Sequence, residues 1–337
     1  MKKRQEMNFG KIEKILVFGG GNSCINFILE ANKKDFDVVL FSSKRLLEER
    51  LNNIKFESRL IKLSINYIYV KDINTIDCKK YITNSSLGVS FGAPWIFKGD
   101  FIDKFNGKFV NEHGAKLPED RGGGGFSWKI MRGLSFGHHL FHLINKKIDS
   151  GDVILMSEFI FPESCTTPLD YEKYSVKDKI IFLKNFLIKI KKQESFSRTP
   201  QQDSSSSYFP RLFTARHGYI NWDWDLDEII KFIDAFGEPY GGAITYNNEK
   251  KVYIGKVTKD KSGKSFHPFM NGLVYRKTED SLFISISNGS LVIKEVNDEY
   301  GKSTIDSIKI GSRFYTLQED LDRAKSYRAV YSSQGLE

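Results

Sequence analysis

The first half of the chain alternates between short apolar runs and amphipathic segments. Apolar runs at residues 14–19 and 36–42 flank a segment at 23–33 that can form a helix, and a second helix is expected over 46–54. Further strands are expected at residues 65–70, 87–91, 108–111, 140–144 and 153–161. Parallel strands need a crossover between them, which is usually a helix. The alternation therefore predicts an α/β fold with a Rossmann-like, mostly parallel sheet.

The pattern changes after a long amphipathic helix that we expect over residues 176–192. Residues 193–210 are rich in Ser, Gln and Pro, which is typical of a linker. A further helix is expected over 227–236. Short strands are expected after it, at residues 243–256, 272–275, 282–287 and 290–296. We therefore predict an α/β domain over 1–192, a linker over 193–210, and a C-terminal domain over 211–337 with one helix and a small OB-like β-barrel.

Composition is that of a soluble globular protein. Of the 337 residues, 40% are hydrophobic and 28% are charged, so a packed core is expected. No apolar stretch approaches the roughly 20 residues of a membrane helix, and no apolar run follows the basic N-terminus as in a signal peptide. The three cysteines, Cys24, Cys78 and Cys165, are widely spaced and fit reduced thiols. These features predict a cytoplasmic protein without a membrane partner.

The chain has a formal net charge of +9, and its basic residues are scattered. The densest group, five lysines between residues 179 and 192, is typical of a solvated helix face, with nucleic-acid binding as the alternative. The charge favours acidic ligands, including nucleotide phosphates, without choosing among them.

Three consecutive glycines, Gly19, Gly20 and Gly21, follow the first predicted strand. A dinucleotide-binding turn needs a further glycine where Cys24 stands, and an acidic residue at the end of the second strand, which ends in Ser42. The turn therefore indicates a nicotinamide cofactor only weakly. Another anion at the helix N-terminus, or a plain tight turn, is favoured.

Residues 109–153 contain the strongest chemical signal. Asn111 and His113 are two apart on a predicted strand, so their side chains lie on one face. They also lie at the carboxyl end of that strand, where open α/β sheets place their sites. From the spacing alone, a hydrogen-bonded surface pair is the simpler interpretation.

A longer pattern contains these two residues. It reads Asn-x-His-x-x-x-Leu-Pro-x-x-Arg-Gly from Asn111, and Ile-Asp-Ser-Gly-Asp from Ile148. This pattern resembles the folate-dependent formyltransferases, a family that includes methionyl-tRNA formyltransferase, glycinamide ribonucleotide formyltransferase and the sugar-nucleotide N-formyltransferases. The resemblance covers most of the chain. It implies an enzyme that transfers the formyl group of N10-formyltetrahydrofolate to a primary amine.

The resemblance implies a catalytic triad of Asn111, His113 and Asp149. The Asn111 amide and an N–H of His113 would stabilise the oxyanion of a tetrahedral intermediate. Asp149 would orient His113 and help to move a proton from the attacking amine to the leaving folate nitrogen. His142 is expected to support the triad. The residues expected to flank the pterin, largely through backbone groups, are Trp95, Ile96, Phe97, Asn145, Lys146 and Ile148.

His138, His139 and His142 do not predict a metal site. In a strand, His138 and His142 face one way and His139 the other, so the three do not converge easily. No cysteine or acidic residue has metal-site spacing near them. No metal is expected.

Two acceptors compete. Length, the predicted β domain and positive charge suit methionyl-tRNA. However, the tRNA enzymes carry a basic insertion after the second strand, and the segment between residues 41 and 65 is short here. The glycine run at 122–125 and the sequence Ser-Tyr-Phe-Pro-Arg at 207–211 are more similar to the sugar-nucleotide enzymes.

The substrate-binding residues implied by this similarity are Arg121, Gly124, Tyr208, Phe209 and Arg211. Tyr208 or Phe209 would stack on a base, and Arg211 would pair with diphosphate oxygens. The alternative is that Phe209 and Pro210 only pack the linker. The glycine run is expected to let the chain approach a ligand closely.

We therefore predict an N-formyltransferase for a nucleoside-diphosphate-linked amino sugar in lipopolysaccharide O-antigen synthesis. A 4-amino-4,6-dideoxyhexose is favoured over a 3-amino isomer. Analogy with the sugar enzymes suggests a homodimer, and nucleic acid is not expected as a partner. Two alternatives are an inactive folate or nucleotide-sugar binding module and a hydrolase that releases formate. The intact triad argues against the first, and the lack of a regulatory domain before Lys14 argues against the second.

Overall fold

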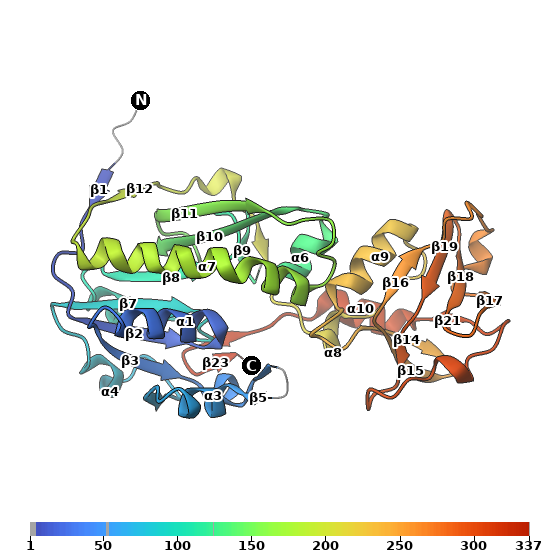
Figure 1. The fold of residues 1–337 in the computed structure, drawn as a ribbon, viewed down its shortest axis with the longest axis horizontal. Coiled ribbons are helices and arrows are strands. Elements are labelled where there is room, and N and C mark those ends of the chain that lie inside the picture. Colours follow the sequence, from blue (N-terminus) through green and yellow to red (C-terminus); the bar gives the residue numbers. More distant parts are fainter. Residues whose placement is uncertain (1–4, 52–53, 124, 337) are drawn as a thin grey trace.

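The computed structural model describes residues 5–51, 54–123 and 125–336. Figure 1 shows an α/β domain built from the first part of the chain, with a smaller β-rich domain beside it. The last residues leave the β-rich domain and return to the α/β domain. The two ends of the chain therefore lie on the same domain.

Within the described residues, a seven-stranded sheet with the order β11-β10-β8-β7-β2-β3-β6 forms the centre of the α/β domain. Five neighbouring strands, β8, β7, β2, β3 and β6, run parallel to one another. Strand β10 runs antiparallel to its two neighbours, β8 and β11. The bounds are β2 (Lys14–Gly19), β3 (Asp37–Ser42), β6 (Tyr67–Tyr69), β7 (Ser86–Phe91), β8 (Phe109–His113), β10 (Phe136–Leu143) and β11 (Val153–Ile160). The predicted mostly parallel, Rossmann-like sheet is confirmed.

Helices cover both faces of this sheet, as Figure 1 shows. Ile15 and Val17 of β2 join a core with α1 (Gly21–Asn32) and α7 (Pro168–Lys191). Leu16 and Phe18 point the other way, into a core with α4 (Ile76–Lys79) and α5 (Gly99–Asp103). Both faces of the sheet are buried, which explains why the strands are continuous apolar runs rather than alternating ones.

The segment between β3 and β6 differs from its prediction. Helix α2 (Lys44–Glu48) is short, and β4 (Arg50–Leu51), β5 (Ile54–Lys55) and a separate helix α3 (Phe56–Lys62) follow it. The predicted single helix over 46–54 is therefore wrong. Only Leu46 and Leu47 of α2 are buried, so no apolar stripe favours a longer helix.

Helix α7 begins eight residues before its predicted start. The Thr167 side chain accepts a hydrogen bond from the Asp170 N–H, while the Asp170 carboxylate accepts one from the Thr167 N–H. Pro168 occupies the first turn, where its missing N–H costs nothing. Although α7 has 24 residues, the described part of the chain contains no helix that is both long and apolar enough to span a bilayer.

Residues 193–210, the predicted linker, pack along the α/β domain as short strands and a turn. β12 (Phe196–Arg198) pairs with β1 (Gln5–Met7) in antiparallel fashion. β13 (Tyr208–Phe209) pairs in parallel with β9 (Arg121–Gly122). The polar composition of this segment therefore belongs to an exposed but ordered path. The domain boundaries themselves stay a prediction.

The described part of the C-terminal domain contains two four-stranded antiparallel sheets, ordered β20-β15-β14-β21 and β16-β19-β18-β17. Helix α9 (Leu226–Ala235) packs on their shared core. A bridge between Leu273 and Arg313 links the two sheets. The bounds are β14 (Ala243–Asn247), β15 (Lys250–Ile254), β16 (Val257–Lys259), β17 (Val274–Lys277), β18 (Leu282–Ile286), β19 (Gly289–Ile293), β20 (Val296–Asn297) and β21 (Phe314–Tyr315). An OB-like barrel stays a prediction.

The two domains meet through α6 (Phe126–Met131) of the α/β domain, which packs against α9. Ser127 donates a hydrogen bond to the Ala235 carbonyl oxygen across this contact, at 2.7 Å. Beyond the sheets, α10 (Gln318–Ser326) packs against α8 (Thr214–His217). The chain then runs back to the α/β domain, where β22 (Tyr331–Ser332) and β23 (Gly335–Leu336) form a hairpin.

Candidate active site

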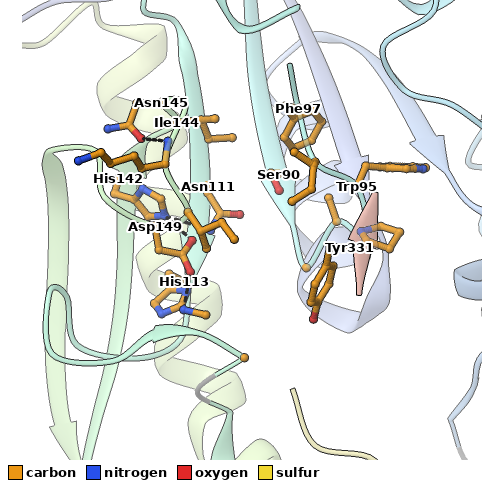
Figure 2. A pocket seen from close by; sticks show the side chains of 18 of the residues that line it. Ser90, Trp95, Phe97, Asn111, His113, His142, Ile144, Asn145, Asp149 and Tyr331 are labelled. Atoms are coloured by element: carbon orange, nitrogen blue, oxygen red, sulfur yellow. Dashed lines mark hydrogen bonds and ion pairs between the residues drawn. The ribbon is translucent and has the colours of Figure 1, made fainter. Parts of the chain in front are cut away.

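A pocket with a cavity volume of about 230 Å³ lies at the carboxyl ends of β7 and β8. Figure 2 shows its two walls. Asn111, His113, His142 and Asp149 lie on one wall, and Trp95, Phe97 and Tyr331 lie on the other. This is the edge of an open parallel sheet at which ligands bind.

The structure brings the three predicted catalytic residues together. Asn111 and His113 lie at the end of β8, and both side chains line the pocket. Asp149 comes from the loop between β10 and β11, and its Oδ2 atom lies 3.9 Å from Nδ1 of His113. The geometry is that of a triad in one pocket, and the catalytic role of each residue stays a prediction.

A backbone carbonyl determines which nitrogen of His113 carries the hydrogen. Nε2 of His113 lies 2.8 Å from the carbonyl oxygen of Asp120. A carbonyl oxygen only accepts, so Nε2 is the protonated nitrogen of the neutral ring. Nδ1, which faces Asp149, then has a free lone pair. His113 is therefore placed to accept a proton at Nδ1, and the hydrogen bond from a His113 N–H to the oxyanion that the resemblance implies stays a prediction.

His142 orients the side-chain amide of Asn111. Nδ1 of His142 lies 2.9 Å from the Leu143 carbonyl oxygen, so it carries the hydrogen of the neutral ring. In the neutral ring Nε2 accepts a hydrogen bond from Nδ2 of Asn111 at 3.1 Å; it also lies 3.4 Å from Oδ1 of Asp149, to which it donates when the ring is protonated. The second hydrogen of the Asn111 amide remains for a ligand in the pocket. The expected supporting role of His142 thus has a direct geometric basis.

Asp149 is held as a carboxylate. Burial by itself would raise its pKa, but the nearby His113, the contact with His142 and a hydrogen bond from the Gly122 N–H at 2.8 Å outweigh it. The result is a pKa well below the usual range of a carboxyl group. Asp149 is therefore ionised and can stabilise a positive charge on His113.

The residues predicted to flank the pterin all line the pocket: Trp95, Ile96, Phe97, Asn145, Lys146 and Ile148. One expectation about them changes. The backbone N–H of Ile96 donates to the carbonyl oxygen of Ser332 at 2.8 Å, so this group is not available to a ligand. Ile144 also lines the pocket, on the side of Asn111 and across from Phe97 (Figure 2).

The predicted acceptor-binding residues separate into groups. Arg211 lines the pocket. The guanidinium of Arg121 instead donates to Gln201 at 3.0 and 3.1 Å and pairs with Asp203 at 2.9 Å. Phe209 lies with its ring 5.4 Å from that of Trp128 and packs under the Arg132 guanidinium. It therefore packs the segment, as the alternative interpretation held. Tyr208 is half exposed, and Gly124 lies outside the described residues.

Close packing by residues 208–211 explains the glycines at positions 122 and 123. Gly122 has a φ of +88°, and a Cβ atom there would lie 2.5 Å from the Tyr208 ring. A Cβ at Gly123 would lie 2.6 Å from the backbone of Arg211. These glycines therefore let residues 208–211 pack directly on the strand before α6. The close approach at these two positions is made by the chain's own segment rather than by a ligand.

The other two histidines of β10 have separate environments. Nε2 of His138 lies 2.7 Å from the Glu158 carboxylate. His139 lies between Phe159 and Phe182, and burial lowers its pKa to about 3. Within the described residues, no group of three His, Cys, Asp or Glu side chains is arranged to hold a metal ion.

The glycine turn after β2 does not line this pocket. Gly20 donates its N–H to the Phe91 carbonyl oxygen at 3.1 Å, and Asn22 donates to Glu172 at 2.7 Å. These contacts fit the plain tight turn that the sequence favoured over a nicotinamide site.

Comparison with known proteins adds family information. Residues 213–308 match the family model described as formyl transferase, C-terminal domain. Methionyl-tRNA formyltransferase of Ruminiclostridium cellulolyticum is 25% identical over 199 residues, which are 57% of this chain and 60% of that protein. The match thus spans less than two thirds of this curated relative.

Two solved structures share the fold. An N-formyltransferase from Helicobacter canadensis, in complex with folinic acid and dTDP-3-aminofucose, has a TM-score of 0.63 and 21% identity, covering 85% of this chain and 99% of that chain. A 4-N formyltransferase from Francisella tularensis has a TM-score of 0.58 and 19% identity, covering 73% and 98%. The domain match and the shared fold confirm the predicted resemblance to the formyltransferase family.

Proposed function

We propose that this protein transfers the formyl group of N10-formyltetrahydrofolate to the amino group of a nucleoside-diphosphate-linked amino sugar. The observation that carries the proposal is the arrangement of Asn111, His113 and Asp149 on one wall of one pocket. That wall offers a hydrogen-bond donor, a proton acceptor and a fixed negative charge, which formyl transfer to an amine requires together.

The space between the two walls fits a folate ring. Phe97 and Ile144 present apolar surface across the pocket from each other, and Ile148, which also lines the pocket, is 49% exposed. Asn145 and Lys146 add polar groups at the same end of the pocket. A flat heteroaromatic ring with polar edges suits a slot of this chemistry. When bound, the co-substrate supplies an activated formyl group, whose bond to the folate nitrogen would break after the new carbon–nitrogen bond has formed.

Asn111 is placed to stabilise the negative charge that develops on the formyl oxygen. Its amide is already oriented by His142, at 3.1 Å, so little reorganisation is needed during the reaction. A donor held in advance is the arrangement that stabilises an oxyanion most effectively.

His113 is placed to transfer a proton from the attacking amine to the leaving folate nitrogen. The attacking amine must be neutral, and it loses a proton once the carbon–nitrogen bond has formed. Nδ1 of His113 can accept that proton, because Nε2 is already committed to the Asp120 carbonyl oxygen. The ionised Asp149 stabilises the resulting imidazolium, which then returns the proton to the leaving folate nitrogen.

Two observations support a sugar-nucleotide acceptor. The Helicobacter canadensis structure, which covers 85% of this chain, holds dTDP-3-aminofucose. In addition, the segment between β3 and β6 is short, and its described residues form α2, the paired strands β4 and β5, and α3. The curated relatives favour methionyl-tRNA as the second candidate. We keep the 4-amino-4,6-dideoxyhexose as the leading acceptor and the 3-amino isomer as the next, in cytoplasmic synthesis of lipopolysaccharide O-antigen by a homodimer.

The test is a formylation assay with the full chain and N10-formyltetrahydrofolate. The acceptors are 3-amino and 4-amino sugars linked to TDP, UDP or GDP, and methionyl-tRNA in a separate arm. We expect one nucleotide sugar to gain the mass of one formyl group. Reaction of the charged tRNA alone would reject the sugar acceptor, and folate binding without any transfer would reject the catalytic proposal.

A further inference from the structure

The hairpin at the end of the chain reaches the pocket. Among the described residues that line it, Tyr331 of β22 is the only one from beyond Arg211. It also lies outside residues 213–308, which match the formyl transferase C-terminal domain. Figure 2 shows Tyr331 beside Trp95, on the wall that faces the triad. A segment with no counterpart in the motif thus contributes to the site.

Specific hydrogen bonds hold the hairpin in this place. Ser332 accepts from the Ile96 N–H at 2.8 Å, and Ser333 accepts from the Ile73 N–H at 3.2 Å through its carbonyl oxygen. The Ser333 hydroxyl also donates to Asp72 at 2.9 Å. Because Ile96 itself lines the pocket, the hairpin both supports the wall and extends it.

A positive charge lies in the same pocket as Tyr331. Arg211 lines this pocket, and its backbone packs so closely on Gly123 that a Cβ atom there would lie 2.6 Å from it. A guanidinium group that lines a pocket favours an anionic ligand.

Tyr208 lies between Arg211 and the triad. Its ring packs on Gly122, where a Cβ atom would lie 2.5 Å from it, and the Gly122 N–H donates to the Asp149 carboxylate at 2.8 Å. Tyr208 is therefore near the catalytic carboxylate and on the same segment as Arg211. The charged end of the pocket and its reacting end are thus continuous, as a substrate with an amine at one end and an anion at the other requires.

We propose that the C-terminal hairpin is a wall of the acceptor site, in which Tyr331 acts with Arg211 to bind the diphosphate of the nucleotide sugar. This inference rests on the proposed function. Guanidinium and phenol groups are strong donors to phosphate oxygens. The carboxylates of a folate tail share this anionic chemistry, so the experiment must separate the two ligands.

The experiment measures binding by calorimetry, separately for folinic acid and for each of TDP, UDP and GDP. The variants are Tyr331→Phe, Tyr331→Ala and Arg211→Gln. Lys44→Gln is the control, because the Lys44 side chain is 75% exposed and does not line the pocket. We expect Arg211→Gln and Tyr331→Ala to weaken binding of the preferred nucleotide about 10- to 100-fold, as loss of a charge-assisted hydrogen bond implies. Folinic acid binding and the Lys44→Gln variant should match the wild type.

Tyr331→Phe removes the hydroxyl and leaves the ring that packs the hairpin. A loss of nucleotide affinity in this variant, with an unchanged melting temperature, supports a direct contact. Wild-type nucleotide affinity in all three variants would overturn the role of the hairpin while leaving the proposed function standing. A loss confined to folinic acid would overturn the diphosphate assignment. If the wild type binds folinic acid but no nucleotide, the acceptor class itself is rejected and the inference falls with it.

Discussion

The two walls of the pocket are built in different ways. On the catalytic wall, Asn111 and His113 belong to β8, and Asp149 lies in the loop between β10 and β11. Their polar atoms are held by close partners, at 2.8 Å for His113 and 3.1 Å for Asn111. On the opposite wall, the loop after β7 is held by Ser332 from the far end of the chain.

This difference separates chemistry from binding. The catalytic wall needs a few donors and acceptors at fixed geometry, and neighbouring strands of a rigid sheet provide them. The binding wall needs shape and apolar surface, which segments from distant parts of the chain can supply together. Changes on the first wall should therefore reduce turnover, and changes on the second should reduce affinity.

Replacing Asn111 should have the largest effect. Asn111→Ala removes the oriented amide donor, so kcat should fall about 100- to 1000-fold, as for other oxyanion donors. Folinic acid affinity, measured by calorimetry, should stay close to that of the wild type. Asn84→Ala, an exposed asparagine outside the pocket, is the control. Near-normal turnover in Asn111→Ala would show that the catalytic wall is assigned wrongly.

Asp149→Asn tests the electrostatics of the same wall. The native fold depresses the pKa of Asp149, so its ionised form stabilises the folded state above the unfolded pKa of about 3.9. That contribution is lost as the pH falls through the lower folded pKa. The wild type should therefore melt above the variant at pH 7, and the gap should narrow below about pH 4. A gap that does not change between pH 7 and pH 2.5 would contradict this account.

Ile148→Ala tests the apolar lining proposed to bind the folate ring. The side chain is 49% exposed and lines the pocket, so a bound ring would cover it. Its loss should cost about 1 kcal/mol of binding, or roughly a fivefold rise in the dissociation constant of folinic acid. We expect kcat to be nearly unchanged at saturating co-substrate. Ile61→Ala, at an exposed isoleucine that does not line the pocket, serves as the comparison.

Arg121→Gln should have the smallest effect. Arg121 bonds to Gln201 and to the exposed Asp203 rather than facing the pocket. An ion pair with an exposed partner contributes about 1 kcal/mol or less to stability. The KM for the nucleotide sugar should change less than about twofold, which is below 0.5 kcal/mol. A tenfold rise in this KM would restore Arg121 to the acceptor site that the sequence predicted for it.

The sequence alone predicts much of the catalytic wall, for a local reason. Side chains two apart on a strand lie on one face, so Asn111 and His113 must share a side of the sheet. The motif then adds Asp149 by resemblance. The sheet follows from apolar runs alternating with helices. The start of α7 was predicted eight residues too late, although the capping box of Thr167 and Asp170 around Pro168 is a signal that the sequence contains.

Only the tertiary structure decided the rest. The ring nitrogen of His113 that carries the hydrogen depends on the Asp120 carbonyl, and the packing of Tyr208 on Gly122 depends on pairing between β13 and β9. The hairpin at Tyr331 reaches the pocket through hydrogen bonds to Ile73 and Ile96. Local patterns report the periodicity of a strand or helix, but contacts between distant segments depend on how complete surfaces fit, which no short stretch of sequence encodes.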